Sequence, residues 1–279
     1  MRPFFSIVIP TLNEEKFLPK LLRDLSKQIF KQFEVIIVDG NSNDRTKEIS
    51  SYFSHKFPNL SVVNSSKRNV SYQRNLGAKK SSGKYLVFFD ADVKIPNEFL
   101  EGIYYQIHSK KIKFLTTWFV PDSMRKSEKL LVRLSNIGIE MANIMDQPFV
   151  PGFNTIVKKS VFQEVNGYRE NITISEDHDF ARRVCKKGYE LVVLREPKLT
   201  MSLRRFRSEG TLEVLLKYMK VNVYFLINGP ITKKIFDYPM GGHIYQGNQV
   251  RKRSLNNAID YYISQVTKLQ KHIEKIIDF

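Results

Sequence analysis

An apolar run from Tyr85 to Phe89 leads directly into two carboxylates, Asp90 and Asp92, separated only by Ala91. A short unbroken apolar run with aromatic and β-branched members is typical of a strand buried on both faces of a parallel sheet. Carboxylates at positions i and i+2 can bind one hard cation, Mg²⁺ or Mn²⁺, which also takes phosphate oxygens as ligands. The stretch therefore suggests a metal site for a diphosphate, although the same acids could simply end the strand or cap the next helix.

The elements that would position these carboxylates alternate between strand and helix over about the first ninety residues, which is the order of a doubly wound parallel sheet. Asn13 is a candidate N-cap for the first helix. Ligands of such sheets bind at the carboxyl ends of the strands, where Thr11, Asp39 and the two acids would meet. We predict strands over residues 5–10, 33–39, 60–63 and 85–89, and helices over residues 14–25, 44–54 and 71–81.

The rest of the chain is predicted to add helices and short strands. Ser175 is expected to cap a helix that ends at Gly188. The helix from Ser254 has apolar residues at alternating spacings of three and four, so we expect it to pack on the body or to pair two subunits as a homodimer. We divide the chain into a domain of residues 1–207 and a helical C-terminal extension of residues 208–279. The predicted helices cover residues 97–109, 127–145, 160–165 and 212–227, and the predicted strands cover residues 113–118, 155–157, 190–194 and 199–203.

Composition limits the class of protein and its partners. The chain has 279 residues, of which 42% are hydrophobic and 26% charged, as in ordinary globular proteins. Lys and Arg number 45 against 28 Asp and Glu, which gives a formal net charge of +17. That excess favours an anionic partner: nucleic acid, an anionic membrane face or a phosphorylated substrate. Cys185 is the single cysteine, and the N-terminus lacks a signal-peptide layout, so a cytoplasmic location is expected.

Six stretches occur in an order that carries a resemblance to a known family. The chain resembles the family 2 glycosyltransferases, which are inverting enzymes with the GT-A fold. The resemblance implies a Rossmann-like, mostly parallel α/β sheet flanked by helices. It also implies an enzyme that transfers a sugar from a nucleotide-diphosphate sugar. The stretches are Ser6–Glu15 (SIVIPTLNEE), Val38–Thr46 (VDGNSNDRT), Gln73–Ala78 (QRNLGA), Phe89–Asp92 (FDAD), Pro151–Asn154 (PGFN) and Ser175–Phe180 (SEDHDF).

The resemblance implies a role for each matching residue. Asp90 and Asp92 would hold the metal and the diphosphate, with Asp92 the more direct ligand. Asp177, beside Glu176, would be the general base that takes the proton of the acceptor hydroxyl. The remaining nucleotide-sugar contacts would come from Pro10, Thr11, Asn13, Glu14, Asp39, Arg68, Arg74 and Ala91.

Each of these residues also has a purely structural explanation. Asp39 could form a turn before Gly40, and Arg74 could be a solvated helix residue. Glu176 and Asp177 could be first-turn acids that interact favourably with the helix dipole.

A basic cluster after the last predicted strand is the candidate clamp. Arg204, Arg205 and Arg207, with Asn154, would bind a diphosphate or lipid phosphate; a solvated basic turn is the alternative. The only tryptophan, Trp118, lies elsewhere, although many relatives carry one near such a cluster. This departure, and the lack of long transmembrane segments, argues against a processive polysaccharide synthase.

The sequence therefore predicts an inverting, metal-dependent glycosyltransferase. A UDP-sugar is favoured over GDP-mannose as donor, and the acceptor would be a hydroxyl or a lipid phosphate. The basic excess and the amphipathic C-terminal third suggest peripheral docking on the inner, anionic face of the cell membrane. The alternatives are a basic nucleic-acid-binding protein, a nucleotidyltransferase and a coiled-coil assembly protein. Scattered Lys and Arg argue against nucleic acid as a partner, and a glycine-rich phosphate loop is missing at Pro10.

Overall fold

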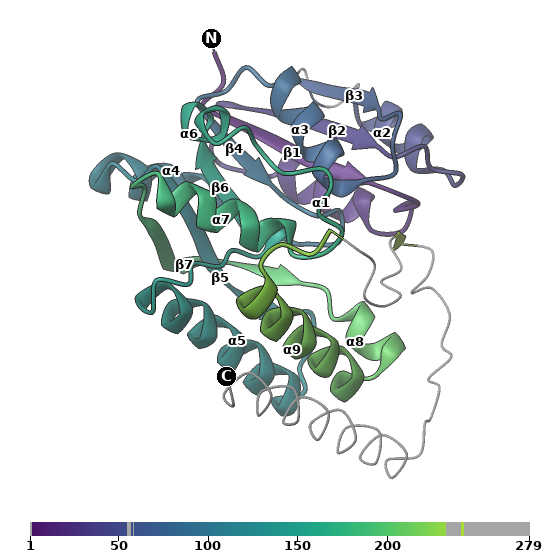
Figure 1. Ribbon diagram of the computed structural model, residues 1–279. Coiled ribbons are helices and arrows are strands. Elements are labelled where there is room, and N and C mark those ends of the chain that lie inside the picture. The colour runs from purple at the N-terminus through teal and green to yellow at the C-terminus, as the bar shows by residue number, and fades with distance from the viewer. Residues whose placement is uncertain (1, 55–56, 58, 233–240, 243–279) are drawn as a thin grey trace, which may run out of the picture.

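The computed structural model of the protein describes residues 2–54, 57, 59–232 and 241–242. Within these residues a seven-stranded sheet has the strand order β3-β2-β1-β4-β6-β5-β7, with helices on both faces (Figure 1). The predicted α/β fold with a mostly parallel sheet is confirmed, since β6 alone in this sheet runs antiparallel to its neighbours. The helix predicted from Ser254, and the homodimer predicted through it, fall outside the described residues.

The first four strands are parallel and end at one edge of the sheet. They are β1 (Phe5–Thr11), β2 (Phe33–Asp39), β3 (Leu60–Asn64) and β4 (Tyr85–Phe88). Their register pairs Thr11 with Asp39, and Val8 with Phe88. The carboxyl ends of β1, β2 and β4 therefore lie next to one another, as the alternating strand and helix order predicts.

The antiparallel strand brings a fifth segment to the same edge. β6 (Thr155–Lys158) lies between β4 and β5 (Phe114–Pro121), and its first residue pairs with Phe88 at the end of β4. Because β6 runs in the opposite direction, the short 3₁₀ helix that precedes it, η1 (Gly152–Asn154), arrives beside the residues that follow β4. The sequence pattern predicts this strand but carries no signal for its direction.

β7 (Leu191–Met201) is one strand of 11 residues, so the prediction of two strands over residues 190–194 and 199–203 is wrong. Pro197 interrupts the apolar pattern, but β7 lies at the edge of the sheet, where a proline is tolerated. β7 pairs with β5 on both sides of an irregularity between Thr117 and Phe119. The ladder therefore continues past the proline.

Two apolar clusters, one on each face of the sheet, hold the helices in place. Successive side chains of a strand point to opposite faces, so Ile7 joins one cluster and Val8 the other. The first cluster contains residues of α1 (Leu18–Ser26), α2 (Thr46–Ser54), α4 (Phe99–Lys110) and α5 (Lys126–Ile144). The second contains residues of α3 (Val70–Lys80), α6 (Lys159–Glu164) and α7 (Glu176–Lys186).

Two helices follow the sheet, α8 (Arg204–Glu209) and α9 (Thr211–Asn228), and Figure 1 shows α9 on the same side of the molecule as α5. The basic cluster after β7 thus forms a short helix. None of the helices in the described part of the chain combines the length and the apolarity that crossing a membrane requires.

Two helix starts differ from expectation. α1 begins at Leu18, and Asn13 is not its N-cap. Asn13 has a φ of 54°, and its side-chain oxygen accepts a hydrogen bond of 2.8 Å from the N–H of Asn43. It therefore ties the β1–α1 loop to the turn before α2. Ser175 occupies the N-cap position of α7 as predicted, but its side chain makes no capping bond.

Candidate active site

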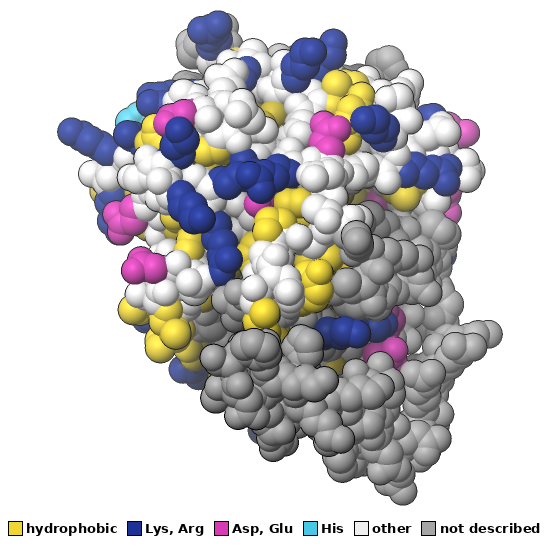
Figure 2. All heavy atoms as spheres, viewed as in Figure 1, with side chains coloured by type: hydrophobic (Ala, Val, Ile, Leu, Met, Phe, Trp, Pro, Cys, Tyr) yellow, Lys and Arg dark blue, Asp and Glu magenta, His cyan; other side chains and the backbone are white. Residues whose placement is uncertain are grey.

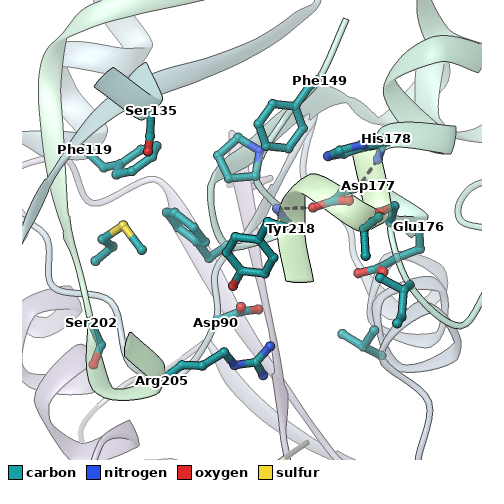
Figure 3. Close-up of a pocket in the computed structure, with 18 of the residues that line it drawn as sticks. Asp90, Phe119, Ser135, Phe149, Glu176, Asp177, His178, Ser202, Arg205 and Tyr218 are labelled. Atoms are coloured by element: carbon teal, nitrogen blue, oxygen red, sulfur yellow. Dashed lines mark hydrogen bonds between the residues drawn. The ribbon is translucent and has the colours of Figure 1, made fainter. Parts of the chain in front are cut away.

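A cavity of about 740 Å³ opens at the carboxyl ends of β1 and β4 and extends between α5, α8 and α9. This volume lies in the upper half of the ~300–1,000 Å³ range of small-molecule pockets. One part of the cavity is lined by charged residues, and the other by apolar side chains. In the view of Figure 3, Phe119 and Ser135 lie on one side, Glu176 and Asp177 on the other, and Asp90 between them.

Arg74 connects acids from two distant parts of the chain. Its guanidinium, on the buried face of α3, donates hydrogen bonds of 3.1 Å to Asp90 and 2.7 Å to Glu176. It also lies 5.3 Å from the ring centre of the buried Tyr168. Burial alone would lower the pKa of Arg74, but the carboxylates of Asp90 and Glu176 raise it above the usual range. Arg74 is thus a permanent cation that fixes the start of α7 to the residues after β4.

Arg204, the first residue of α8, connects the other acids of the site. Its two terminal nitrogens donate hydrogen bonds of 2.8 Å each to the carboxylate of Glu14, and its Nε lies 2.9 Å from Oδ2 of Asp92. Burial raises the pKa of Asp92 to about 7, and it raises the pKa of Glu14 above its usual range. Arg204 opposes both shifts. This guanidinium therefore neutralises carboxylates that would otherwise repel each other.

Asp177 is held by backbone donors at the wall of the cavity. Its Oδ2 accepts a hydrogen bond of 3.0 Å from the N–H of Gly152, and its Oδ1 accepts one of 2.9 Å from the N–H of His178 (Figure 3). Burial raises the pKa of Asp177, and both burial and Asp177 raise the pKa of Glu176. Each carboxylate oxygen has two acceptor positions, so Asp177 keeps capacity to take a proton from a hydroxyl.

His178 lies beside Asp177 and was not identified from the sequence as a separate site residue. Its ring centre is 4.2 Å from that of Phe149 and 5.6 Å from that of Phe225 in α9. Burial lowers the pKa of His178 to about 4, so the imidazole is neutral near pH 7. The only sequence signal was its place inside an acidic helix start. For Phe149 and Tyr218, which also line the cavity, the sequence offers no signal.

Most of the predicted site residues come together, although they are spread over almost two hundred positions. Four do not line the cavity: Asn13, Asp39, Asn154 and Arg207. Those that do are Pro10, Thr11, Glu14, Arg68, Arg74, Asp90, Ala91, Asp92, Glu176, Asp177, Arg204 and Arg205.

Asp39 lies directly behind the cavity wall. Its side chain is fully buried, and its carboxylate accepts hydrogen bonds of 2.9 Å from the N–H of Ser42 and 3.3 Å from the hydroxyl of Thr11. Thr11 itself lines the cavity. Asp39 thus supports the strand end and the turn that follows it.

The other members of the predicted clamp have partners elsewhere. Arg207 forms two hydrogen bonds, of 2.9 and 2.8 Å, with the carboxylate of Asp122. The side-chain amide of the fully buried Asn154 donates a hydrogen bond of 2.8 Å to the carbonyl of Thr117 in β5. The structure therefore brings only Arg204 and Arg205 of the predicted clamp to the cavity.

Formal charges in the cavity balance, in contrast to the net charge of +17 of the whole chain. The charged residues among the described lining are five carboxylates and five arginines. The excess of positive charge therefore lies outside the cavity. The carboxylates belong to Glu14, Asp90, Asp92, Glu176 and Asp177, and the guanidinium groups to Arg68, Arg74, Arg182, Arg204 and Arg205.

Comparison with known sequences identifies relatives of this chain. The model of the family described as Glycosyl transferase family 2 matches residues 6–165. The chain is 27% identical to glycosyltransferase AglE of Haloferax volcanii over 195 residues, which are 68% of this chain and 64% of that protein. It is 43% identical over 95 residues to a 4,4'-diaponeurosporenoate glycosyltransferase of Staphylococcus haemolyticus, covering 33% of this chain and 25% of that protein. The chain thus spans less than two thirds of the length of these relatives.

Solved structures support the same fold. The mannosyltransferase PcManGT from Pyrobaculum calidifontis, in complex with GDP-Man and Mn²⁺, superposes with a TM-score of 0.62 at 16% identity, covering 82% of this chain and 71% of that one. Residues 1–349 of Staphylococcus aureus TarS, in complex with UDP-GlcNAc, superpose with a TM-score of 0.60 at 20% identity, covering 81% of this chain and 73% of that one. At these identities the likeness shows the fold alone, and it confirms the predicted GT-A type.

Proposed function

Because the chain belongs to glycosyltransferase family 2, we propose that it transfers a sugar, with inversion, from a nucleotide-diphosphate sugar to an acceptor. One observation carries the proposal: a carboxylate with a raised pKa, Asp177, lies in the same cavity as the acids after β4 and the buried cation Arg74. Those are the groups needed to hold a diphosphate and to activate an attacking hydroxyl.

The charged part of the cavity suits the donor. Pro10 and Thr11 end β1 and would border the nucleotide, with Asp39 supporting Thr11 from behind. Arg68 and Arg74 would face the phosphates, where charge-assisted hydrogen bonds are strongest. A UDP-sugar is favoured and GDP-mannose is the second choice; solved structures of the same fold hold UDP-GlcNAc and GDP-Man.

The donor set after β4 fits a divalent cation that is shared with the donor. No group of three or more His, Cys, Asp or Glu residues in the described parts of the chain is placed to hold a metal. We propose that Asp90 and Asp92 would supply two protein ligands for Mg²⁺ or Mn²⁺, and that diphosphate oxygens would supply others. A cation bound there offsets the negative charge that grows on the leaving diphosphate. The formal charge balance of the cavity supports this, because a diphosphate alone would leave an excess of negative charge.

Asp177 would act as the general base. It would accept the proton of the acceptor hydroxyl as that oxygen attacks the anomeric carbon from the face opposite the diphosphate. The N–H groups of Gly152 and His178 fix the orientation of the carboxylate. Glu176, held by Arg74, would position the start of α7.

The acceptor and the location in the cell extend the proposal. Arg204 and Arg205 would close on the diphosphate or on the phosphate of a lipid-linked acceptor, in the synthesis of a cell-envelope glycan or glycolipid. A relative in Methanococcus voltae, 33% identical over 103 residues, is named as a glucuronosyltransferase that acts on dolichyl N-acetyl-alpha-D-glucosaminyl phosphate. We place the protein in the cytoplasm, peripheral on the inner face of the membrane, with residues 208–279 as an extension of the catalytic part.

Nucleic-acid binding without transfer is not favoured. Figure 2 shows that Lys and Arg side chains of the described residues on the face in view are dispersed and do not gather into one basic groove. Binding to nucleic acid by shape or sequence would require such a groove or a stacking platform.

A thermal-shift screen tests the proposed function. The full chain is heated with a panel of UDP- and GDP-sugars, with and without Mn²⁺. We expect one nucleotide sugar to raise the melting temperature by several degrees in the presence of the metal and much less without it, because a ligand that binds only the folded state stabilises it. Absence of a metal-dependent shift with every nucleotide sugar would contradict the proposal.

A further inference from the structure

The apolar part of the cavity is a groove between two facing helices. α5 contributes Leu131, Ser135 and Gly138, and α9 contributes Tyr218, Met219 and Phe225. α5 also lines the groove with Val132, Ile139 and Ala142, so most of the groove wall is apolar. The groove is continuous with the part of the cavity that holds Asp177, so a ligand in the groove would have one end near the proposed base.

Gly138 indicates that the groove has to stay open. A glycine inside a helix costs about 0.5–1 kcal/mol relative to alanine. Among the described glycines, only Gly138 has neither a positive φ nor any heavy atom within 4 Å of a built Cβ. Neither backbone conformation nor close packing therefore explains it. Among the described residues, a Cβ at this position, which lines the groove, meets no heavy atom within 4 Å.

Two of the arginines that line the cavity adjoin helix α9. Arg205 lines the cavity from α8, which packs on α9, and the guanidinium of Arg182 lies 4.6 Å from the ring centre of Phe225. An anionic group joined to a long apolar chain would match this arrangement, with its charge near the arginines and its chain between α5 and α9. A free sugar would leave the apolar groove walls without a partner.

The outer surface beside the groove is also apolar. On α5, the side chain of Leu134 is 57% exposed and that of Ile144 is 75% exposed; on α9, that of Ile227 is 60% exposed. The exposed Lys129 and Arg133 share α5 with them. Exposed apolar residues with adjacent bases are typical of a helix that lies at the surface of an anionic membrane. The hydrocarbon part of a ligand that extends out of the groove would therefore contact apolar side chains.

We propose that the groove between α5 and α9 binds the hydrocarbon chain of a lipid-linked acceptor, with its phosphate beside Arg205 and Arg182. This inference rests on the proposed function and assigns the acceptor end of the same cavity. The bound hydrocarbon is an acyl or isoprenoid chain. The groove selects lipids by the length of this hydrocarbon, because each buried methylene adds binding free energy.

Calorimetric titration of the full chain with geranyl phosphate, farnesyl phosphate and inorganic phosphate tests the proposal. Farnesyl phosphate should bind at least about tenfold more tightly than geranyl phosphate, because it buries more apolar surface. Gly138→Leu fills the groove and should weaken farnesyl phosphate binding by at least about tenfold. Gly138→Ala is the matched control, and it should change that affinity by less than about twofold. Melting temperatures of both variants establish that they fold.

Three results would overturn the inference: affinity that is independent of chain length, Gly138→Leu binding farnesyl phosphate as the wild type does, or a wild-type dimer that Gly138→Leu dissociates without lipid binding. The last would make the groove an interface between two copies. A donor thermal shift, measured on the same samples, separates this inference from the proposed function. If the donor shift persists without chain-length-dependent binding, the groove assignment alone fails. If lipid phosphates bind by length and no nucleotide sugar does, the donor proposal fails.

Discussion

Asp177 combines two properties that a general base needs, a fixed orientation and a raised pKa. Two backbone N–H groups hold its oxygens, and burial of the carboxylate raises its pKa. Because backbone N–H groups, and not the side chains proposed to bind the donor, hold its oxygens, proton abstraction and donor binding are separable by substitution.

Replacing Asp177→Asn should lower the transfer rate by about 10²–10⁴-fold, which is the usual contribution of a positioned general base. The donor-dependent rise in melting temperature should persist, because Asp90, Asp92 and Arg74 are unchanged. Radiolabelled sugar transfer measures the first effect and thermal shift the second. Glu140→Gln serves as the control, since Glu140 pairs with Arg195 outside the cavity lining. A near-wild-type rate in the Asn variant would refute the base assignment.

The pH profile supplies a further check on the same residue. A general base works only when deprotonated, so the wild-type rate should fall as the pH drops through the pKa of Asp177. Burial raises that pKa, so the fall should begin above the pH range of an ordinary aspartate. Any residual rate in the Asn variant should lack the part of the acidic limb that Asp177 contributes, and the part set by Asp92, whose pKa is about 7, should remain.

At the level of residues, the sequence predicts the acids better than their partners. Asp90, Asp92 and Asp177 stand in recognisable short motifs. The pairing of Arg204 with Glu14 joins residues 190 positions apart, and no local pattern predicts it. Asn154 and Arg207 were assigned to the clamp from their positions in the sequence. In the structure Asn154 instead donates a hydrogen bond to Thr117, and Arg207 donates one to Asp122.

At the level of elements, α3 places Arg74 by packing very closely on the sheet. A Cβ built on Gly77 would lie 2.3 Å from Cγ1 of Val8 in β1 and 3.1 Å from Cγ2 of Val38 in β2. Only a glycine therefore allows the helix to approach β1 and β2 this closely. The position of the Arg74 guanidinium between Asp90 and Glu176 depends on that approach.

Alanine should have opposite effects at the two helical glycines. Gly77→Ala should lower the free energy of unfolding by about 1–3 kcal/mol, since it overpacks the interface between helix and sheet. Gly138→Ala should raise it by about 0.5–1 kcal/mol, because it removes the entropic cost of glycine and meets open space. Urea denaturation of both variants measures the changes, and each serves as the control for the other. Effects of the same sign would contradict the packing described for α3 or for α5.

The sequence predicts where most elements lie but not how the later strands pair. Apolar runs and helical periodicity identify β1 to β4 and their helices because these segments follow a regular alternating order. The antiparallel direction of β6 depends on its pairing with β4 and β5, to which its four residues give no clue. The continuity of β7 past Pro197 likewise depends on its edge position, a tertiary property.

At the level of the whole molecule, the net charge and the charge of the cavity differ. The cavity lining balances its formal charges, so the excess of +17 acts at the surface and does not select the donor. A surface of this kind favours anionic membranes over neutral ones.

The full chain should therefore sediment with vesicles that contain anionic lipid, and little of it should sediment with neutral vesicles. Binding should weaken as salt rises from about 0.1 to 1 M, since the screening length falls from about 10 to 3 Å. Equal sedimentation with both vesicle types would show that surface charge does not direct the protein to membranes. Salt-resistant binding would instead indicate that insertion of apolar side chains dominates.

Arg204 also links the two ends of the cavity to each other. It forms ion pairs with Glu14 and Asp92, and it stands on α8, which is tied to α9 by the pair Glu209–Lys217 at 2.6 Å. A diphosphate that recruited Arg204 would disturb both of its ion pairs and, through α8, the wall of the groove. Thermodynamic reciprocity then requires donor and acceptor to alter each other's affinity by the same factor. A bound donor would thus alter the width of the acceptor groove, and a ligand in the groove would alter the affinity for the donor to the same degree.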